Sequence, residues 1–187
     1  LYPETWGGWH QFSPYNELVK DYECIDGMSI EESPLYNEDL PYENRDPRLL
    51  YTILVNGYSS FQGKLYISTP GSTSLDRLGK YPQWSGYCIR KYMDETSTNA
   101  QLKNSGVDIP LIRYAEVLLG YIESKLESGV SITQNDLDIS INLVRGRADV
   151  NMPKITETNK DKLRDIVRRE RHIELAFEGI RYYDILR

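Results

Sequence analysis

The sequence of 187 residues predicts a mainly α-helical fold with long loops and a few short β-strands. Three stretches between residues 107 and 187 carry apolar side chains at the three-four spacing of an amphipathic helix. Residues 1–106 instead hold short elements between turn signals. The length suits one ordinary domain with its own core. We therefore expect a single domain over 1–187, with a loop-rich, aromatic part at 1–106 and a helical part at 107–187.

In the first part, turn and cap signals predict only short elements. The Ser-Pro pair at 13–14 and the Asp-Pro pair at 46–47 each place a capping residue before a proline, so a short helix should begin at each. Residues 51–55 and 87–92 have compositions compatible with short strands. Most of the remaining chain up to residue 106 is expected to be loop.

The first long helix is expected to begin at Asp108, with Pro110 in its first turn, and to end at Gly129. Its predicted apolar stripe consists of Ile112, Ala115, Leu119, Ile122 and Leu126. A stripe this narrow needs partner helices to be buried.

The second helix should open with Thr133 and Asp136, a variant of the capping box. Its predicted apolar face consists of Leu137, Ile141, Val144 and Ala148. The third helix should start near Asn159 or Asp161 and break at Gly179, after which residues 181–187 resume a short helix.

The third helix carries a carboxylate inside its apolar stripe. Leu163, Ile166, Ile173 and Phe177 have the spacing of a buried face, but Glu170 occupies the slot between Ile166 and Ile173. A buried carboxylate needs a cationic partner, and the guanidinium fork of arginine suits it better than an ammonium group. We therefore predict a structural charge network made of Arg113, Glu116, Arg145, Arg147, Glu170, Arg171, Glu174, Glu178 and Arg181.

Four segments together resemble the SusD/RagB family of surface glycan-binding lipoproteins. They are ERHIELAFEGIRYYDILR at 170–187, PLIRYAEVLLGYIESKLESG at 110–129, INLVRGRAD at 141–149, and the stretch from SPYNELVKDYECIDG at 13–27 to SPLYNEDLPYENRDPRLLYTIL at 33–54. Each segment alone is only moderately specific. All of them occur here in the order that the family has.

The resemblance implies a fold of the alpha-alpha superhelix type and a non-catalytic function without a cofactor. Such a protein sits on the outer face of a Gram-negative outer membrane, partners a TonB-dependent (SusC-like) transporter and captures oligosaccharides for uptake. Its membrane association depends on a lipidated N-terminus. We expect that anchor, a helical-repeat half and a final stretch beyond Arg187 to lie outside this chain, as parts of a longer protein.

The charge of the chain argues against nucleic acid as a partner. The formal net charge is −6 and the isoelectric point is about 5.1, whereas nucleic-acid-binding domains gather excess lysine and arginine on one face. Cys24 and Cys88 have no metal-ligand spacing, and the sequence leaves open whether they pair.

No catalytic motif of a hydrolase, metalloprotease or nucleotide-binding enzyme is present. Glu170, Glu174 and Glu178 lie in one row along a helix, so they do not form the facing pair that a glycosidase needs. The loop acids that a glycosidase fragment would have to use are Asp26, Glu31, Glu32 and Asp94.

Aromatic residues are the stronger functional signal, because flat rings offer faces on which sugars stack. The chain has 15 tyrosines and 3 tryptophans, and its densest aromatic groups lie at 1–12 and 80–87. Two glycines between Trp6 and Trp9 would let both rings reach the surface. The residues that we expect to bind a glycan are Trp6, Trp9, Trp84, Tyr81 and Gln83.

Two other interpretations stay open. Each ring taken alone is more typical of a loop-rich core, because tryptophan and tyrosine bury large areas. The helical part is also compatible with a scaffold that binds proteins without any sugar, which buried tryptophans and an exposed apolar groove would favour.

Overall fold

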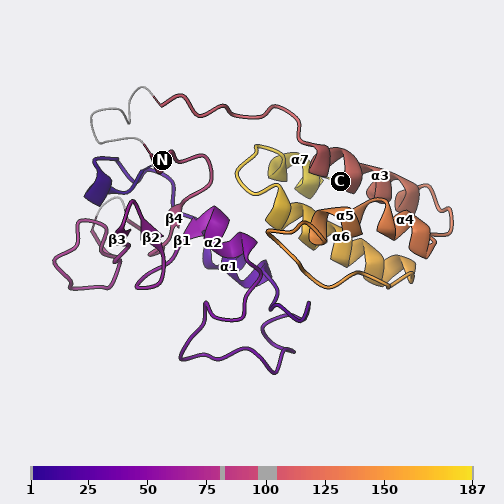
Figure 1. The fold of residues 1–187 in the computed structure, drawn as a ribbon, viewed down its shortest axis with the longest axis horizontal. Coiled ribbons are helices and arrows are strands. Elements are labelled where there is room, and N and C mark those ends of the chain that lie inside the picture. Colours follow the sequence, from indigo (N-terminus) through magenta and orange to yellow (C-terminus); the bar gives the residue numbers. More distant parts are fainter. Residues whose placement is uncertain (1, 81–82, 97–104, 187) are drawn as a thin grey trace. The chain divides into compact units, whose positions relative to one another are not determined.

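The computed structural model describes residues 2–80, 83–96 and 105–186 (Figure 1). The predicted fold class is confirmed, because helices predominate and the strands are only two residues long. The chain divides into two compact units. The aromatic unit comprises Leu1–Val19, Leu40–Tyr42 and Leu49–Ile109, and the helical unit comprises Lys20–Asp39, Glu43–Arg48 and Pro110–Arg187. The division after Ile109 lies close to the boundary expected at 106, but most of 20–48 belongs with the helices.

The aromatic unit is built on short elements joined by turns. Its elements are the 3-10 helix η1 (Glu4–Trp6) and the strands β1 (Ile53–Leu54), β2 (Ser60–Phe61), β3 (Lys64–Leu65) and β4 (Cys88–Ile89). β1 pairs antiparallel with β4, and β2 with β3. The strands expected at 51–55 and 87–92 are therefore present, shorter than expected and paired with each other.

The core of the aromatic unit is rich in rings. The buried cluster consists of Tyr2, Trp6, Leu54, Phe61, Tyr66, Cys88 and Met93. Trp6 and Tyr2 both meet Phe61 edge-on, with ring centroids 5.6 and 5.9 Å apart. Such T-shaped contacts add to the stability that burial of the rings supplies.

Two short helices follow the predicted caps. α1 (Asn16–Asp21) begins two residues after Pro14, and α2 (Arg48–Thr52) begins directly after Pro47. Both helices span the division between the two units. The predicted helix starts at 13–14 and 46–47 are thus confirmed to within a turn.

The first long helix starts later than expected. α3 (Tyr114–Glu127) has Arg113 as its N-cap, and the backbone of Arg113 is extended. The start expected at Asp108 is therefore wrong, and Ile112 lies outside the helix with 72% of its surface exposed. Leu118 takes a place in the buried stripe instead. Gly129 ends this segment as expected, with a φ of 81° that an L side chain rarely adopts.

The second predicted helix is divided in two. α4 (Gln134–Asp138) opens with the expected capping box of Thr133 and Asp136, and α5 (Ile141–Arg145) follows after Ser140. Leu137, Ile141 and Val144 are buried as expected. Ala148 is exposed beyond the end of α5, because the helix stops at Arg145.

The third helix begins at the predicted N-cap but ends before the predicted Gly179. The side chain of Asn159 accepts hydrogen bonds from the backbone of Asp161 and Lys162 at the start of α6 (Lys160–Glu174). The expected apolar residue Phe177 is partly exposed in the turn before Gly179, where its φ is +64°. The final helix is α7 (Arg181–Leu186), and no described helix is long and apolar enough to cross a membrane.

The long helices of the helical unit enclose one apolar core, in which α3 packs against both α5 and α6 (Figure 1). Its buried side chains are Ala115, Leu118, Leu119, Ile122, Leu126, Ile132, Leu137, Ile141, Val144, Leu163 and Val167. The loop segment before α2 joins this unit through Tyr22, whose hydroxyl donates to the carbonyl of Ile173 at 3.3 Å. Cys24 in that segment and Cys88 in the aromatic unit are both buried, and they form no disulfide.

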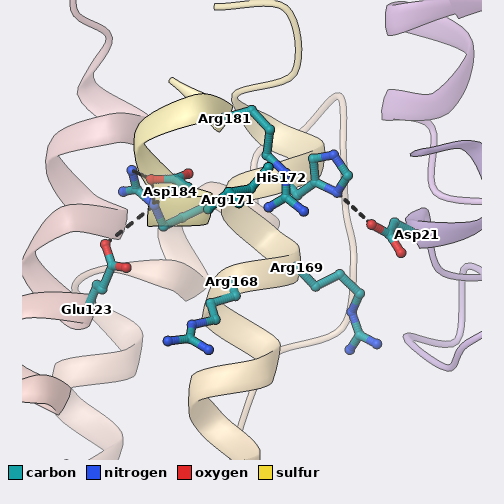
Figure 2. A pocket seen from close by; sticks show the side chains of 9 residues that line it. Asp21, Glu123, Arg168, Arg169, Arg171, His172, Arg181 and Asp184 are labelled. Atoms are coloured by element: carbon teal, nitrogen blue, oxygen red, sulfur yellow. Dashed lines mark hydrogen bonds and ion pairs between the residues drawn. The ribbon is translucent and has the colours of Figure 1, made fainter. Parts of the chain in front are cut away.

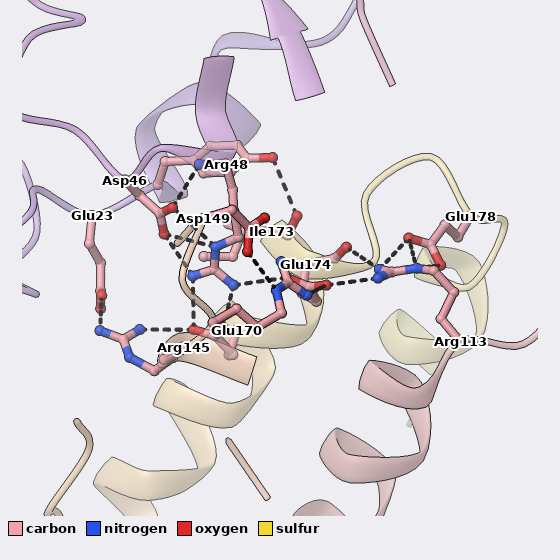
Figure 3. A network of polar contacts seen from close by, with 12 residues as sticks. Glu23, Asp46, Arg48, Arg113, Arg145, Asp149, Glu170, Ile173, Glu174 and Glu178 are labelled. Atoms are coloured by element: carbon pink, nitrogen blue, oxygen red, sulfur yellow. Dashed lines mark hydrogen bonds and ion pairs between the residues drawn. The ribbon is translucent and has the colours of Figure 1, made fainter. Parts of the chain in front are cut away.

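Glu170 lies at the centre of a buried ion-pair network (Figure 3). Its carboxylate accepts from Arg48 at 2.5 Å and from Arg145 at 2.8 Å. Arg48 also pairs with Asp46 at 2.7 Å, and Arg145 with Glu23 at 2.8 Å. All five side chains are almost fully buried. The network thereby ties residues 23–48 to α5 and α6.

A second carboxylate on α6 extends the network toward the start of α3. Glu174 pairs with Arg48 at 3.1 Å, Arg113 at 2.9 Å and Arg147 at 2.7 Å. The guanidinium group of Arg113 also donates hydrogen bonds to both carboxylate oxygens of Glu178. Burial of Arg48 works against its charge, yet Glu170 and Asp46 raise its pKa well above the ordinary value.

Removal of the central carboxylate should destabilise the fold strongly. Glu170→Ala leaves the guanidinium groups of Arg48 and Arg145 buried without this partner, so we expect the free energy of unfolding to fall by about 3–5 kcal/mol. Urea denaturation followed by circular dichroism measures this change. Glu127→Ala, which removes an exposed partner of Arg164, is the matched control and should move the midpoint little. Equal midpoints for the two variants would contradict a stabilising role of the network.

The network should also make stability fall in acid. Burial raises the pKa of Glu174, but the neighbouring arginines Arg147, Arg48 and Arg113 outweigh it and hold the pKa below the usual 4.5. A depressed carboxyl pKa stabilises the fold above about pH 4.5 and loses this contribution as the pH falls through the folded-state value. We expect the melting temperature to drop steeply below that pH. The Glu174→Gln variant should have a lower melting temperature at pH 7, and its melting temperature should fall less steeply in acid. Parallel curves of melting temperature against pH for the variant and the unchanged protein would contradict this.

Candidate functional site

Among the described residues of the aromatic unit, the four most exposed aromatic rings are Trp9, Phe12, Tyr15 and Trp84. Trp9 is 75% exposed and Trp84 is 70% exposed, and Phe12 and Tyr15 are similarly open. Three of these four residues come from the first 15 positions of the chain, and Trp84 comes from the segment near residue 85. Exposed tryptophan is unusual in a soluble domain, because its large ring is normally packed. These rings form the candidate site, which we call the aromatic surface.

The two tryptophans near the N-terminus have opposite environments. Trp6 is only 2% exposed and packs against Phe61, so the expectation that both rings reach the surface is wrong for Trp6. The glycines between them cause the difference. Gly7 takes a left-handed φ of 81°, and a Cβ on Gly8 would lie 1.9 Å from the carbonyl oxygen of Tyr2. The chain therefore turns sharply here and leaves Trp9 outside.

Buried polar contacts hold the two aromatic segments side by side. The ring of His10 donates from Nε2 to the carbonyl of Tyr87 at 3.1 Å, because a carbonyl oxygen only accepts. The hydroxyl of Ser13 donates to the side chain of Gln83 at 3.3 Å. His10 precedes Gln11 and follows Trp9, and Gln83 precedes Trp84. Each exposed tryptophan is thus next in the chain to a residue of this buried junction.

Asp76 anchors the start of the same unit. Its carboxylate accepts from the backbone of Glu4 at 2.6 Å and of Thr5 at 3.1 Å, and faces Nδ1 of His10 at 3.4 Å. Burial raises the pKa of Asp76, but the hydrogen bonds from His10 and Thr5 outweigh it and keep the pKa below its usual range. A charged Asp76 therefore fixes the turn that precedes Trp9.

The side chain of Gln83 forms its hydrogen bonds inside the aromatic unit and not at its surface. It is 2% exposed; its amide nitrogen donates to the hydroxyl of Tyr66 at 2.7 Å and its oxygen accepts from the backbone of Gly86 at 3.2 Å. An amide used in this way supports the loop that carries Trp84, which corrects the expectation of direct hydrogen bonds from Gln83 to sugar hydroxyls. Tyr81, also expected to bind a glycan, lies outside the described residues.

The structure brings six of the nine residues of the predicted charge network into contact. These are Arg113, Arg145, Arg147, Glu170, Glu174 and Glu178. Glu116 makes no ion pair with any residue that the structure describes, Arg171 pairs elsewhere with Asp184 and Glu123, and Arg181 lines a cavity.

Sequence reasoning also missed three members of the network, namely Glu23, Asp46 and Arg48. The one signal available for them was the resemblance of 13–54 to the family, because no local pattern links residue 48 to residue 170. Helix periodicity reports only on neighbours within a few turns.

Two cavities of the helical unit differ in character. One holds about 400 Å³ and is lined almost entirely by charged side chains, from the end of α1 and from α3, α6 and α7 (Figure 2). The other holds about 480 Å³ and is lined mainly by apolar atoms along α3 and α5. Tyr114, Leu118 and Leu143 line this apolar groove, with Arg113 and Arg147 among its other residues.

Asp26 and Asp94, two of the four loop acids considered for glycosidase chemistry, stabilise turns. Asp26 accepts from the hydroxyl of Ser33 at 2.6 Å and from the backbone of Met28 at 3.0 Å. Asp94 accepts from the backbone of Thr96 at 2.8 Å. Within the described ranges, no group of three or more histidine, cysteine or acidic side chains is placed to hold a metal ion.

Comparison with known proteins agrees with this architecture. The model of the SusD family matches residues 2–187. A SusD-like carbohydrate binding protein from Bacteroides fragilis NCTC 9343 is 43% identical and has a TM-score of 0.86, over 99% of this chain and 37% of that one. A second SusD-like protein from the same strain is 28% identical, with a TM-score of 0.72 over 95% of this chain and 36% of its own.

A SusD superfamily protein from Bacteroides vulgatus ATCC 8482 shares the fold at 18% identity, with a TM-score of 0.65 over 99% of this chain and 35% of that one. No curated protein matches the chain. The chain thus spans little more than a third of the length of these solved structures. The match over residues 2–187 shows that the chain belongs to the SusD family.

Proposed function

We propose that this chain contributes a glycan-binding surface to a non-catalytic SusD-family protein, and that Trp9 and Trp84 are its main contacts. The observation that carries the proposal is the exposure of both rings on one unit, next to a rigid polar junction. A sugar lays the C–H bonds of its ring on such an aromatic face. The affinity expected of an open surface of this kind is micromolar to millimolar.

Rigid support under the rings favours binding. The contacts of His10, Gln83 and Asp76 immobilise both segments before a ligand arrives, so little backbone order has to be gained on binding. Phe12 and Tyr15 widen the same surface, since both are exposed and follow Trp9 within six residues. The likeness to a solved SusD-like carbohydrate binding protein at 43% identity supports the same conclusion.

The role of the complete protein follows from the family. We infer that it is a lipoprotein of the outer membrane, exposed at the cell surface, that passes oligosaccharides to a TonB-dependent, SusC-like transporter. The aromatic surface would then serve capture, while the remaining two thirds of the family's length supply anchoring and docking. Loss of surface labelling after mutation of the lipidated residue in the full-length protein tests the location.

A protein-binding scaffold is the second candidate. The apolar groove along α3 and α5 favours it, because Tyr114 and Leu143 remain substantially exposed there. Two of the three tryptophans are exposed, however, whereas this candidate expects all of them to be buried. The exposed rings therefore favour the glycan.

Truncation of either exposed tryptophan should weaken glycan binding. We expect Trp9→Ala and Trp84→Ala each to raise the dissociation constant about tenfold, because each removes a stacking face without opening the core. Intrinsic fluorescence during titration with a panel of neutral oligosaccharides measures this. Tyr51→Ala, at another exposed ring of the unit, is the control and should leave affinity unchanged. Unaltered affinity in both tryptophan variants would place the sugar elsewhere.

Gln83 should act on binding through the loop beneath Trp84. Gln83→Leu keeps the size of the side chain but removes the bonds to Tyr66, Ser13 and Gly86. We expect lower thermal stability together with weaker glycan binding, because the ring of Trp84 loses its fixed position. Ser85→Ala, the neighbour on the other side of Trp84, serves as control. Weaker binding at full stability would instead indicate direct contact between Gln83 and the sugar.

A further inference from the structure

The charged cavity of the helical unit has an excess of positive charge. Four arginines and His172 face three carboxylates, and Ile185 is its single apolar lining residue (Figure 2). The chain as a whole has a net charge of −6, so the charge of the cavity is opposite in sign to that of the whole chain. Its volume of about 400 Å³ lies within the range of small-molecule sites.

All three carboxylates of the cavity are already engaged. Asp21 pairs with Nδ1 of His172 at 2.5 Å. Asp184 pairs with Arg171 at 2.8 Å, and Glu123 approaches the same guanidinium at 3.4 Å. These contacts hold one wall of the cavity in place, because the side chain of Arg171 is only 5% exposed.

The remaining arginines differ in how they are neutralised. Arg169 pairs with Glu23 at 2.6 Å, and Glu23 is not one of the residues that line the cavity. Arg168 on α6 and Arg181 on α7 form no ion pair with any carboxylate in the part of the chain that the structure describes. Each offers five N–H donors in a planar fork.

The chemistry of the lining selects the ligand class. A guanidinium fork matches the paired oxygens of a carboxylate or a sulfate. No described tyrosine, tryptophan or phenylalanine lines the cavity, so a neutral sugar would not find there the broad apolar ring face on which sugars stack. An oxyanion group satisfies both the charge and the geometry of the donors.

We propose that this cavity binds a carboxylate or sulfate group carried by a sugar, so that the protein prefers acidic oligosaccharides. The sugar part of the inference rests on the proposed function. The anion part rests only on Arg168, Arg181 and the fixed wall around Arg171. Arg168 and Arg181 are then the residues that determine specificity.

The experiment compares ligands in the full-length protein by isothermal titration calorimetry. The probes are a uronic-acid disaccharide, a sulfated disaccharide, the neutral disaccharide of the same linkage, and sodium sulfate and sodium glucuronate as free anions. We expect an acidic disaccharide to bind about tenfold more tightly than the neutral one, with an advantage that shrinks as salt rises.

Substitutions of Arg168 and Arg181 test whether the preference for acidic ligands arises in this cavity. Arg168→Gln and Arg181→Gln should each abolish most of the preference for the acidic ligand, and both side chains are exposed enough for the fold to persist. Arg164→Gln is the matched control, since this arginine lies on the same helix but pairs with Glu127 outside the cavity. Melting temperatures verify that the variants are folded.

Three results would overturn the proposal. Equal affinity for acidic and neutral disaccharides removes the anion site, and an acidic preference that survives in both cavity variants places it elsewhere. If free sulfate or glucuronate binds as tightly as the acidic disaccharides, the rest of the sugar adds nothing to the affinity, and the cavity is not a sugar site. Trp9→Ala separates this question from the proposed function, because it should weaken the neutral ligand while the preference for the acidic one persists.

Discussion

The burial of the Glu170 carboxylate is the constraint on which the helical unit depends. A charge in the apolar stripe of α6 is tolerated only with cationic partners and hydrogen bonds around it. Arg145 from α5 and Arg48 from the start of α2 supply them at 2.8 and 2.5 Å. Because the two arginines are 97 positions apart in the chain, one carboxylate fixes a loop-rich segment against two helices. Apolar packing alone would leave that loop without a defined position.

A comparable use of buried polar groups shapes the aromatic unit. Its strands are too short to align long loops by themselves, so directional hydrogen bonds of His10, Gln83 and Asp76 do so. These polar contacts lie in the interior together with the buried rings around Phe61. Trp9 and Trp84 remain outside that core, so they are available to a ligand without weakening it.

Helix α6 connects structure and recognition through its periodicity. Glu170 and Glu174 lie one turn apart and point into the buried network, while Arg168 and Arg171 point into the charged cavity on another face. Residues one or two positions apart on a helix face different directions, whereas residues three or four apart are neighbours on one face. A mixed-charge sequence thereby yields an acidic interior row, neutralised by arginines from elsewhere, and a basic surface that carries the excess.

Features that depend on neighbouring residues could be predicted before the fold was known. The caps at Thr133 and Asn159, the end at Gly129 and the anomalous Glu170 are local signals, and the family motifs identified the fold. The partners of Glu170, the late start of α3 at Tyr114 and the burial of Trp6 but not Trp9 became clear only from the folded chain. These outcomes depend on contacts between residues far apart in the chain, such as Trp6 with Phe61 and Arg48 with Glu170, and sequence spacing carries no information about such contacts.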